Sequence, residues 1–514
     1  MMAILSAKYP ALMALIAALL LAHPAAAAPG DPDQGEAIYT LRCLGCHGEE
    51  GDGMGPGAER LNPPPRDFTM GLYKFRTTGF DDYVPNDEDL LRMIRDGMPG
   101  TAMPGWSDVL SGADMRDLIA YLKVFGGLEE EVPTDQVDYG VQVAASEDSI
   151  AKGRELFRDR CDECHGESGK GVATKRLKDD GGARTWPRNL TKPWTFRASN
   201  DARDIFTRIS VGIPGTQMPS YADPRSKKIL TIEERWHVAN YVHSLAGTAQ
   251  VVRPENTVVK ADRIDGDLPS SPDDPKWAES EPSTFYLVPQ IIAKERFFTP
   301  SNDTITVRAL YNDAALAILL EWDDRTRSLP GDPGAETVAG PGLSEDAVAV
   351  QLPVTIPEGM RKPYFGMGDA AHPVNIWHWR SGSAGGPESV RLLDARGFGD
   401  FQERPAEESW LSAAGVYDAG TWRVVMARPL STAAVGRDIQ FEEGRFTPIA
   451  FAAWDGSNGE GGSKHTMTTW YWLLLKPPTG PRPYLVALAV MILIAGAQIW
   501  WARGAARRRR EPET

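Results

Sequence analysis

The sequence predicts a multidomain protein with two all-α domains, then an all-β sandwich, then one C-terminal transmembrane helix. A chain of 514 residues is too long for a single hydrophobic core. Three observations give the order of the parts. Residues 33–127 are repeated at 147–247, short alternating apolar runs begin near residue 284, and residues 485–502 form an almost unbroken apolar run.

The composition excludes some classes of function. Hydrophobic residues make up 42% of the chain and charged residues 24%, which is ordinary for a folded protein. The formal net charge of -15 argues against a nucleic-acid partner and favours basic protein partners, which an acidic surface attracts.

The first residues have the pattern of a secretory signal peptide. Lys8 precedes an apolar run at residues 11–22, and Ala25 and Ala27 offer an A-x-A cleavage site. We expect cleavage after Ala27, which removes residues 1–27 and places the rest of the chain outside the cytoplasm.

All four cysteines lie in two C-x-x-C-H motifs, which are Cys43, Cys46 and His47 in the first copy and Cys161, Cys164 and His165 in the second. This motif attaches haem c covalently: two thiols bind the haem vinyl groups, and the histidine becomes an iron ligand. Zinc is the alternative, since C-x-x-C pairs also bind zinc. The histidine directly after each pair, and the repeat around it, favour haem.

The repeat also offers a second iron ligand in each copy. Gly97-Met-Pro-Gly-Thr-Ala-Met103 matches Gly212-Ile-Pro-Gly-Thr-Gln-Met218. A methionine thioether is the usual distal ligand of electron-transfer haem c. Met98 competes with Met103 in the first copy, but Ile213 stands at that position in the second, so the repeat favours Met103 and Met218.

Other features of the repeat support small helical domains. Ser111 to Asp114 and Thr231 to Glu234 have the pattern of capping boxes before amphipathic helices. His237 and His243 fall on the last of these helices and are expected to be packing or surface histidines. Four arginines are candidates for binding haem propionates, which suit a guanidinium group: Arg66, Arg76, Arg188 and Arg197.

On these motifs, residues 33–127 and 147–247 resemble two class I cytochrome c domains. The resemblance implies two covalently bound haem c groups. Their iron ligands would be His47 with Met103 and His165 with Met218.

Residues 248–283 are rich in Pro, Asp and Ser and are expected to form a linker. From 284 to 477, short runs of β-branched and aromatic residues alternate with Gly, Pro and Asp. This pattern predicts a β-sandwich, with strands expected at residues 304–311, 315–322, 347–352, 420–426 and 449–454.

Three stretches of the sandwich carry a second resemblance. They are residues 317–323, the segment 365–379 with Met367 and several aromatic and histidine residues, and residues 454–465. They resemble the haem b domain of ethylbenzene dehydrogenase-type γ subunits, which serve molybdenum enzymes. The resemblance implies a haem b between a methionine and a lysine, for which Met367 and Lys464 are the candidates.

Several alternatives remain open for this domain. His372, His378 and His465 are other candidate ligands. A lysine ligand must be neutral, so its site must be dry enough to lower the lysine pKa. The sandwich could also hold no haem and bind a protein partner or a glycan.

Residues 484–502 are expected to cross a membrane, and the basic tail 503–514 to stay in the cytoplasm by the positive-inside rule. The prediction is a bacterial inner-membrane protein with most of its chain in the periplasm. The segment contains no histidine, so it is not expected to hold haem within the bilayer or to oxidise quinol directly.

Together these patterns predict an electron-transfer subunit and not an enzyme. The expected partners are iron–sulfur and molybdenum subunits on one side, and a soluble cytochrome c or a quinol-oxidising complex on the other. The usual γ subunit lacks fused cytochromes and a membrane tail, which leaves the catalytic partner open. The alternatives are a dihaem c carrier with a haem-free sandwich and a dihaem peroxidase, which needs an open iron site.

Overall fold

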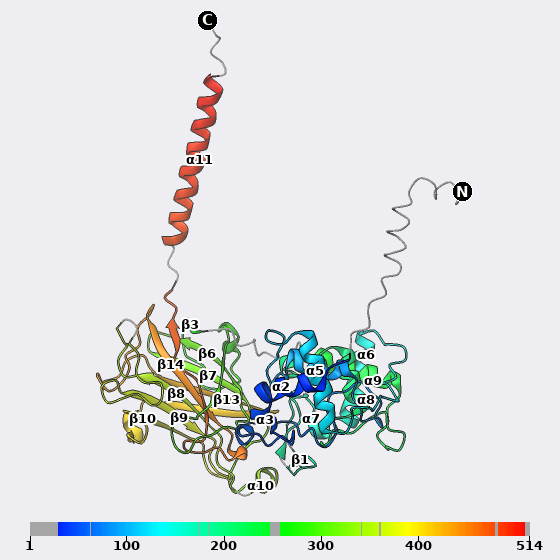
Figure 1. Ribbon diagram of the computed structural model, residues 1–514. Helices are drawn as coiled ribbons and strands as arrows, with labels where there is room; N and C mark the ends of the chain where they lie inside the picture. The colour runs from blue at the N-terminus through cyan, green and yellow to red at the C-terminus, as the bar shows by residue number, and fades with distance from the viewer. Residues whose placement is uncertain are drawn as a thin grey trace.

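The computed structural model describes residues 29–61, 63–172, 174–182, 184–246, 257–340, 342–358, 361–478 and 482–508. These residues form a helical N-terminal region, a large β-sheet region and one long C-terminal helix (Figure 1). The predicted signal peptide lies outside the described residues, as do residues 509–514 of the predicted tail.

The helical region consists of two helical domains with the same order of helices. The first contains α2 (Pro32–Arg42), α3 (Leu44–His47), η1 (Ala58–Arg60), α4 (Asp87–Asp96) and α5 (Gly112–Phe125). The second contains α6 (Glu147–Arg160), α7 (Asp162–His165), β1 (Leu177–Lys178), β2 (Arg184–Thr185), η2 (Pro193–Thr195), α8 (Ala202–Val211) and α9 (Ile232–Leu245). The second domain is therefore not purely α-helical, because β1 and β2 pair antiparallel.

One glycine in each copy sets how the first and last helices cross. A Cβ atom on Gly35 would lie 2.1 Å from the carbonyl oxygen of Asp117, and one on Gly153 would lie 2.0 Å from that of His237. Only glycine allows backbones to approach so closely. The repeat thus fixes the same crossing of α2 with α5 and of α6 with α9.

The predicted capping boxes are confirmed at the last helix of each helical domain. The Ser111 hydroxyl accepts from the Asp114 N–H at 3.2 Å, and the Asp114 carboxylate accepts from the Ser111 N–H at 2.7 Å. Thr231 and Glu234 form the same reciprocal pair before α9.

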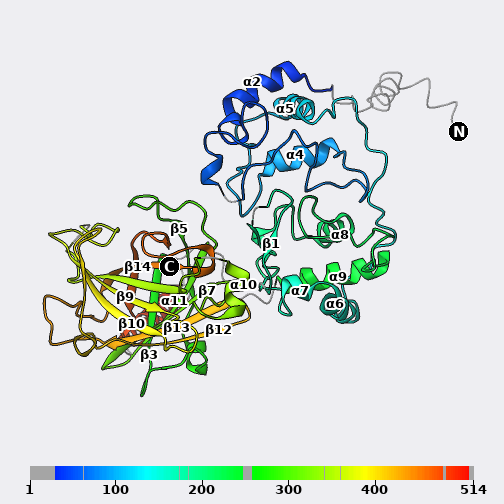
Figure 2. The ribbon, with the colours of Figure 1, turned by 90° about the horizontal axis from the view of Figure 1, so that it is seen from below.

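The second helical domain contacts both of its neighbours. Arg92 of the first domain pairs with Asp204 at 2.8 Å, and Lys192 pairs with Asp323 of the β-sheet region at 2.7 Å. Figure 2 shows the second helical domain beside the β-sheet region, and Arg184 of β2 donates to the carbonyl of Val338 in α10 (Pro333–Ala339) at 3.2 Å.

The β-sheet region, called the β-domain below, has fourteen strands: β3 (Val258–Arg263), β4 (Ser283–Tyr286), β5 (Val288–Pro289), β6 (Thr304–Tyr311), β7 (Ala315–Asp323), β8 (Ala347–Pro353), β9 (Val374–Arg380), β10 (Ser389–Ala395), β11 (Phe401–Glu403), β12 (Ser412–Asp418), β13 (Thr421–Pro429), β14 (Phe446–Trp454), β15 (Thr466–Met467) and β16 (Tyr471–Leu475). Short helices lie between them: η3 (Pro275–Glu279), α10, η4 (Ala406–Glu408) and η5 (Gly456–Asn458). The five predicted strands are all present. Eleven of these strands follow in the order β11-β10-β9-β8-β14-β16-β3-β6-β7-β13-β12, while β4 pairs with β6, β15 with β14, and β5 with β15.

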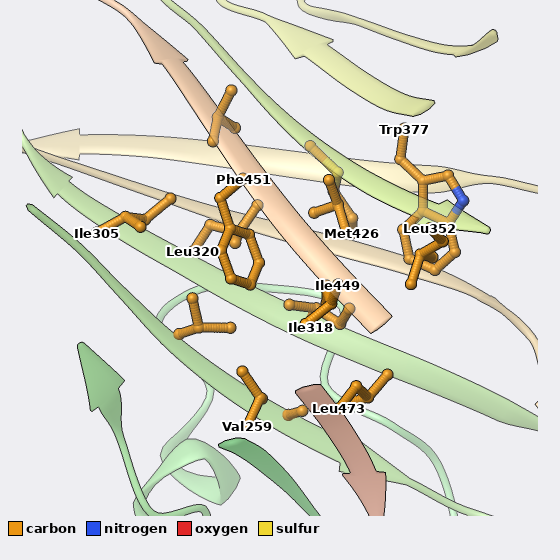
Figure 3. Close-up of a cluster of buried hydrophobic side chains, with 14 of the residues drawn as sticks. Val259, Ile305, Ile318, Leu320, Leu352, Trp377, Met426, Ile449, Phe451 and Leu473 are labelled. Atoms are coloured by element: carbon orange, nitrogen blue, oxygen red, sulfur yellow. The ribbon is translucent and has the colours of Figure 1, made fainter. Parts of the chain in front are cut away.

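The core of the β-domain is built by alternate residues of facing strands. Figure 3 shows Ile305, Leu320, Leu352, Trp377 and Phe451, contributed by β6, β7, β8, β9 and β14, within one buried cluster. The two halves of the sheet therefore pack across this cluster, and the neighbouring residues of β8, β9, β10 and β14 project to the outer face.

The predicted linker 248–283 is wrong in part, because β3 lies inside it. β3 is a central strand, parallel to β16 on one side and to β6 on the other. Its apolar residues Val259 and Ala261 are fully buried, but the strand is short and polar residues flank it. Both of its partners are distant in sequence, so the local pattern gives little sign of it.

The last element is α11 (Arg482–Arg508). It contains a 19-residue apolar segment, Leu485–Arg503, that is long enough to cross a membrane and is unburied within the chain. Figure 1 shows α11 projecting away from the β-domain.

Candidate haem sites

Both C-x-x-C-H motifs lie on a single helical turn that follows a longer helix. Cys43 ends α2 and begins α3, and Cys161 does the same between α6 and α7. None of the four cysteines forms a disulfide. Residues three apart on a helix lie on the same side, so each pair of thiols can reach one planar group.

The two histidines are held in the same way. Nδ1 of His47 lies 3.1 Å from the carbonyl oxygen of Arg66, and Nδ1 of His165 lies 3.1 Å from that of Arg188. A carbonyl accepts a hydrogen bond from Nδ1–H, which leaves the Nε2 lone pair for a metal. Burial lowers the pKa of both imidazoles, which favours the neutral form that binds iron.

The loops that carry Met103 and Met218 have the same pattern of hydrogen bonds. The Met103 N–H donates to the Thr101 hydroxyl at 3.1 Å, and the Met218 N–H donates to the Thr216 hydroxyl at 3.2 Å. The Met98 N–H donates to the Met103 carbonyl at 3.0 Å, and Ile213 makes the equivalent bond to Met218 at 3.1 Å. Met98 is therefore the structural counterpart of an isoleucine, as the repeat predicted.

Some of the candidate arginines and histidines are held by contacts within the protein, and others remain available to a ligand. Arg76 is fully buried and donates to the carbonyls of Asp82 at 2.7 Å, Phe80 at 3.0 Å and Gly79 at 3.3 Å, so it braces its own loop. His237 is a packing residue, 2.8 Å from the Ser149 hydroxyl, and His243 lies 2.7 Å from the carbonyl of Asn200. By contrast, the half-buried Arg66, Arg188 and Arg197 have no side-chain hydrogen bond or ion pair with any residue that the structure describes.

On the β-domain, an apolar outer face is formed by small and medium side chains: Ala349, Val374, Ile376, Leu393, Ala395, Ala450 and Ala452. Met367 and Trp470 pack against it. Alanines on neighbouring strands leave a flat surface, since Ala349 of β8 pairs with Ala452 of β14. These residues are nearly all buried, and Met367 and Trp470 belong to the loops that cover them.

Met367 has a backbone conformation that is uncommon for a residue with a side chain. Its φ is 68°, in the left-handed region that favours glycine. Gln351 of β8 holds the loop: it accepts from the Met367 N–H at 3.1 Å and donates to the Phe365 carbonyl at 2.8 Å. Outliers that the surrounding structure enforces are frequent at functional sites. Sequence reasoning missed Gln351, although the alternation along β8 places it on the same face as Ala349.

Lys464 lies at the surface in an ion pair. Its ammonium is 2.7 Å from the Glu295 carboxylate, and 42% of its side chain is exposed. This arrangement stabilises the charged amine, whereas iron binding needs the neutral one. The next residue, His465, has its ring 4.6 Å from that of Trp454, which packs on the outer face.

The alternative histidines differ in their surroundings. Burial, with the nearby charges of Arg391 and Arg380, lowers the pKa of His378 to about 3, and burial also lowers the pKa of His465. Both are therefore neutral imidazoles near Trp454, whose ring is 5.2 Å from that of His378. His372 is half exposed and pairs with Asp369 at 3.0 Å, which makes it the least suited to hold iron.

A separate group of buried carboxylates lies at the edge of the β-domain core. Asp324, Asp346 and Asp455 bring oxygen atoms within 4.8 Å of one another, and Glu460 is buried beside them. Such oxygen donors are the ligand type that hard cations bind. Burial and the neighbouring carboxylates raise the pKa of Asp346 to about 7 and that of Glu460 to about 8, and raise the pKa of Asp324 as well.

We expect the thermal stability of the β-domain to fall as the pH rises from about 4, the usual pKa of these carboxyls, to about 8. A raised folded-state pKa means that the folded protein binds more protons than the unfolded chain in this window. Differential scanning calorimetry in a chelating buffer should show a Tm loss on the order of several °C. Glu460→Gln should reduce this slope and Glu407→Gln, at an exposed position, should not; a flat Tm in the wild-type protein would contradict the prediction.

Comparison with known proteins identifies the parts. The family model for cytochrome C oxidase, cbb3-type, subunit III matches residues 30–122, that for Cytochrome c matches 150–246, and that for Ethylbenzene dehydrogenase matches 274–405. One relative from Haloferax mediterranei is named as a respiratory nitrate reductase haem subunit. It is 30% identical over 243 residues, which are 46% of this chain and 80% of the relative. The chain belongs to the ethylbenzene dehydrogenase γ-subunit family.

Two further members of this γ-subunit family are similar to the chain. The gamma subunit of chlorate reductase from Ideonella dechloratans is 35% identical over 34% of this chain and 66% of its own length. The gamma subunit of dimethylsulfide dehydrogenase from Rhodovulum sulfidophilum is 27% identical over 46% of this chain and 88% of its own length.

The matched regions contain some of the candidate residues and not others. The two cytochrome matches contain both C-x-x-C-H motifs together with Met103 and Met218, and cytochrome c domains imply covalent haem c. The γ-subunit match contains Met367 but ends before Lys464.

Proposed function

We propose that the chain is the electron-transferring haem subunit of a molybdenum oxidoreductase and connects that enzyme to the respiratory chain. The observation that carries this proposal is the identical histidine arrangement in both cytochrome c domains, joined to a β-domain of the γ-subunit family. Haem supplies one-electron chemistry when bound. The chain's own residues provide ligands, burial and docking surfaces, and none is assigned a catalytic role.

In the cytochrome c domains, the covalent attachment sites are Cys43 with Cys46 and Cys161 with Cys164. His47 and His165 would supply one iron ligand each, and a backbone carbonyl orients each imidazole. Met103 and Met218 would supply the second iron ligand in each domain. A methionine raises the reduction potential and fills the site that a peroxidase would keep open, so it favours electron transfer.

In the β-domain, we propose one haem b on the apolar outer face, with Met367 as one ligand. The strained loop at Met367, fixed by Gln351, supports this assignment. Lys464 would be the second ligand, and it would have to leave Glu295 to hold the iron.

The apolar segment of α11 is proposed to anchor the protein in the bacterial inner membrane. Arg503 and the arginines that follow would stay in the cytoplasm, which leaves the other domains in the periplasm. The proposed partners are the iron–sulfur and molybdenum subunits of an oxidoreductase, and a soluble cytochrome c or a quinol-oxidising complex.

The proposal is tested by purifying the tagged full-length chain from native membranes in mild detergent and measuring its metals. We expect molybdenum to co-purify, with more iron than the haems account for. The matched control is the same chain without its tag. Preparations with intact haem c but no molybdenum above this control would contradict the proposal.

A further inference from the structure

Three arginines from two domains meet where the second cytochrome c domain contacts the β-domain. We call this group, Arg188, Arg197 and Arg325, the arginine seam. Arg325 follows β7, and its guanidinium lies 5.7 Å from the centre of the Trp186 ring in the cytochrome c domain. Arg188 and Arg325 line one cavity of about 30 Å³ between the two domains, which has room for a small polar group.

The positive charges of the seam have no counterion among the residues that the structure describes. None of the three guanidiniums forms an ion pair or donates a side-chain hydrogen bond there, and the Arg197 Nε is buried without a partner. Of the three aspartates that line the cavity, Asp323 and Asp303 pair with Lys192, at 2.7 Å and 3.5 Å. The third, Asp455, accepts a hydrogen bond from the Ser301 hydroxyl at 2.5 Å. Burial lowers the pKa of Arg188 to about 9, and the charges of Arg197 and Arg325 add to this effect. Clustered positive charges favour binding of an anion.

An unpaired amide points to the kind of anion. Asn302 lines the same cavity and is only 4% exposed, yet neither atom of its amide has a hydrogen-bond partner among the described residues. An amide N–H and guanidinium groups are together the donors that a carboxylate accepts.

The haem of this domain carries such carboxylates. The Arg188 backbone carbonyl holds the imidazole of His165 at 3.1 Å, so the seam begins beside the iron ligand. We propose that Arg188, Arg197 and Arg325 bind the propionates of the haem c attached to Cys161 and Cys164, with Arg325 supplied by the β-domain. The inference rests on the proposed haem c at these cysteines, and it places the propionate edge of that haem at the boundary with the β-domain.

The test is an optical redox titration of the full-length holoprotein with Arg325→Gln. Loss of a positive charge beside a propionate stabilises the oxidised haem. At a fixed applied potential, we expect the oxidised-to-reduced ratio of the second haem c to rise about threefold to tenfold, and tenfold corresponds to about 59 mV for one electron. The propionate should also titrate at a higher pH, which moves the pH dependence of that potential.

Arg327→Gln is the matched control, because Arg327 is exposed on the same loop and does not line the cavity. It should leave both haems unchanged, and the first haem c should be unchanged in every variant. Arg325→Lys keeps the charge and should retain most of the wild-type potential. This variant still tests the inference if Arg325→Gln attaches less haem.

Equal shifts for Arg325→Gln and Arg327→Gln, or no shift in either, would overturn the inference. A wild-type protein with haem missing at Cys161 and Cys164 would instead contradict the proposed function, so the two failures are distinguishable by the haem count.

Discussion

Replacing Met218 by alanine will lower the reduction potential of the second haem c on the order of 0.1 V or more, because the thioether is the ligand that raises it. The matching change in the first domain is Met103→Ala. Each variant should also lose the long-wavelength absorption band of one methionine-ligated ferric haem. Redox titration with visible spectroscopy measures both effects.

Met98→Ala is the control for the first domain. Met98 stands where the second domain has Ile213, and its N–H makes the same hydrogen bond. It should leave the potential and the band unchanged. If Met98→Ala removes the band and Met103→Ala does not, the ligand assignment from the repeat is wrong.

Met367→Ala and Lys464→Ala will each reduce the non-covalent haem of the purified protein from one per chain to nearly none. Each removes one of the two proposed iron ligands on the outer face of the β-domain. Extraction with acidified acetone separates this haem from the covalent haem c, which serves as an internal standard of two per chain.

Lys476→Ala is a closely matched control for Lys464→Ala. Both lysine side chains are 42% exposed, and both pair with a carboxylate, Lys476 with Asp262 and Lys464 with Glu295. Haem b should be retained in Lys476→Ala. Retention in Lys464→Ala with loss in His465→Ala or His378→Ala would assign the second ligand to a histidine.

Local motifs made the helical domains predictable. The attachment cysteines and their histidine lie within one short motif, so their spacing in the sequence is enough to predict haem attachment. The internal repeat then separated Met103 from Met98 and aligned Pro65-Arg66 with Pro187-Arg188, whose carbonyls hold His47 and His165. The aligned arginines therefore mark the backbone carbonyl that each imidazole contacts.

Contacts between distant segments were not predictable in the same way. The composition of residues 248–283 predicts a linker, and it does not reveal β3, because the partners of this strand, β6 and β16, are far away in the chain. Arg325 and Trp186 meet only through domain packing. The ion pair between Lys464 and Glu295 joins two loops that are distant in the chain, and neither loop has a sequence pattern that predicts the pair.

The pyridine haemochrome spectrum of the full-length protein, matured in a host that attaches haem c, tests the central claim most directly. The account predicts two haem c and one extractable haem b per chain. Two haem c without haem b would contradict the role of the β-domain as a redox site and leave a dihaem carrier with a docking domain. Fewer than two haem c would contradict the electron-transfer account itself.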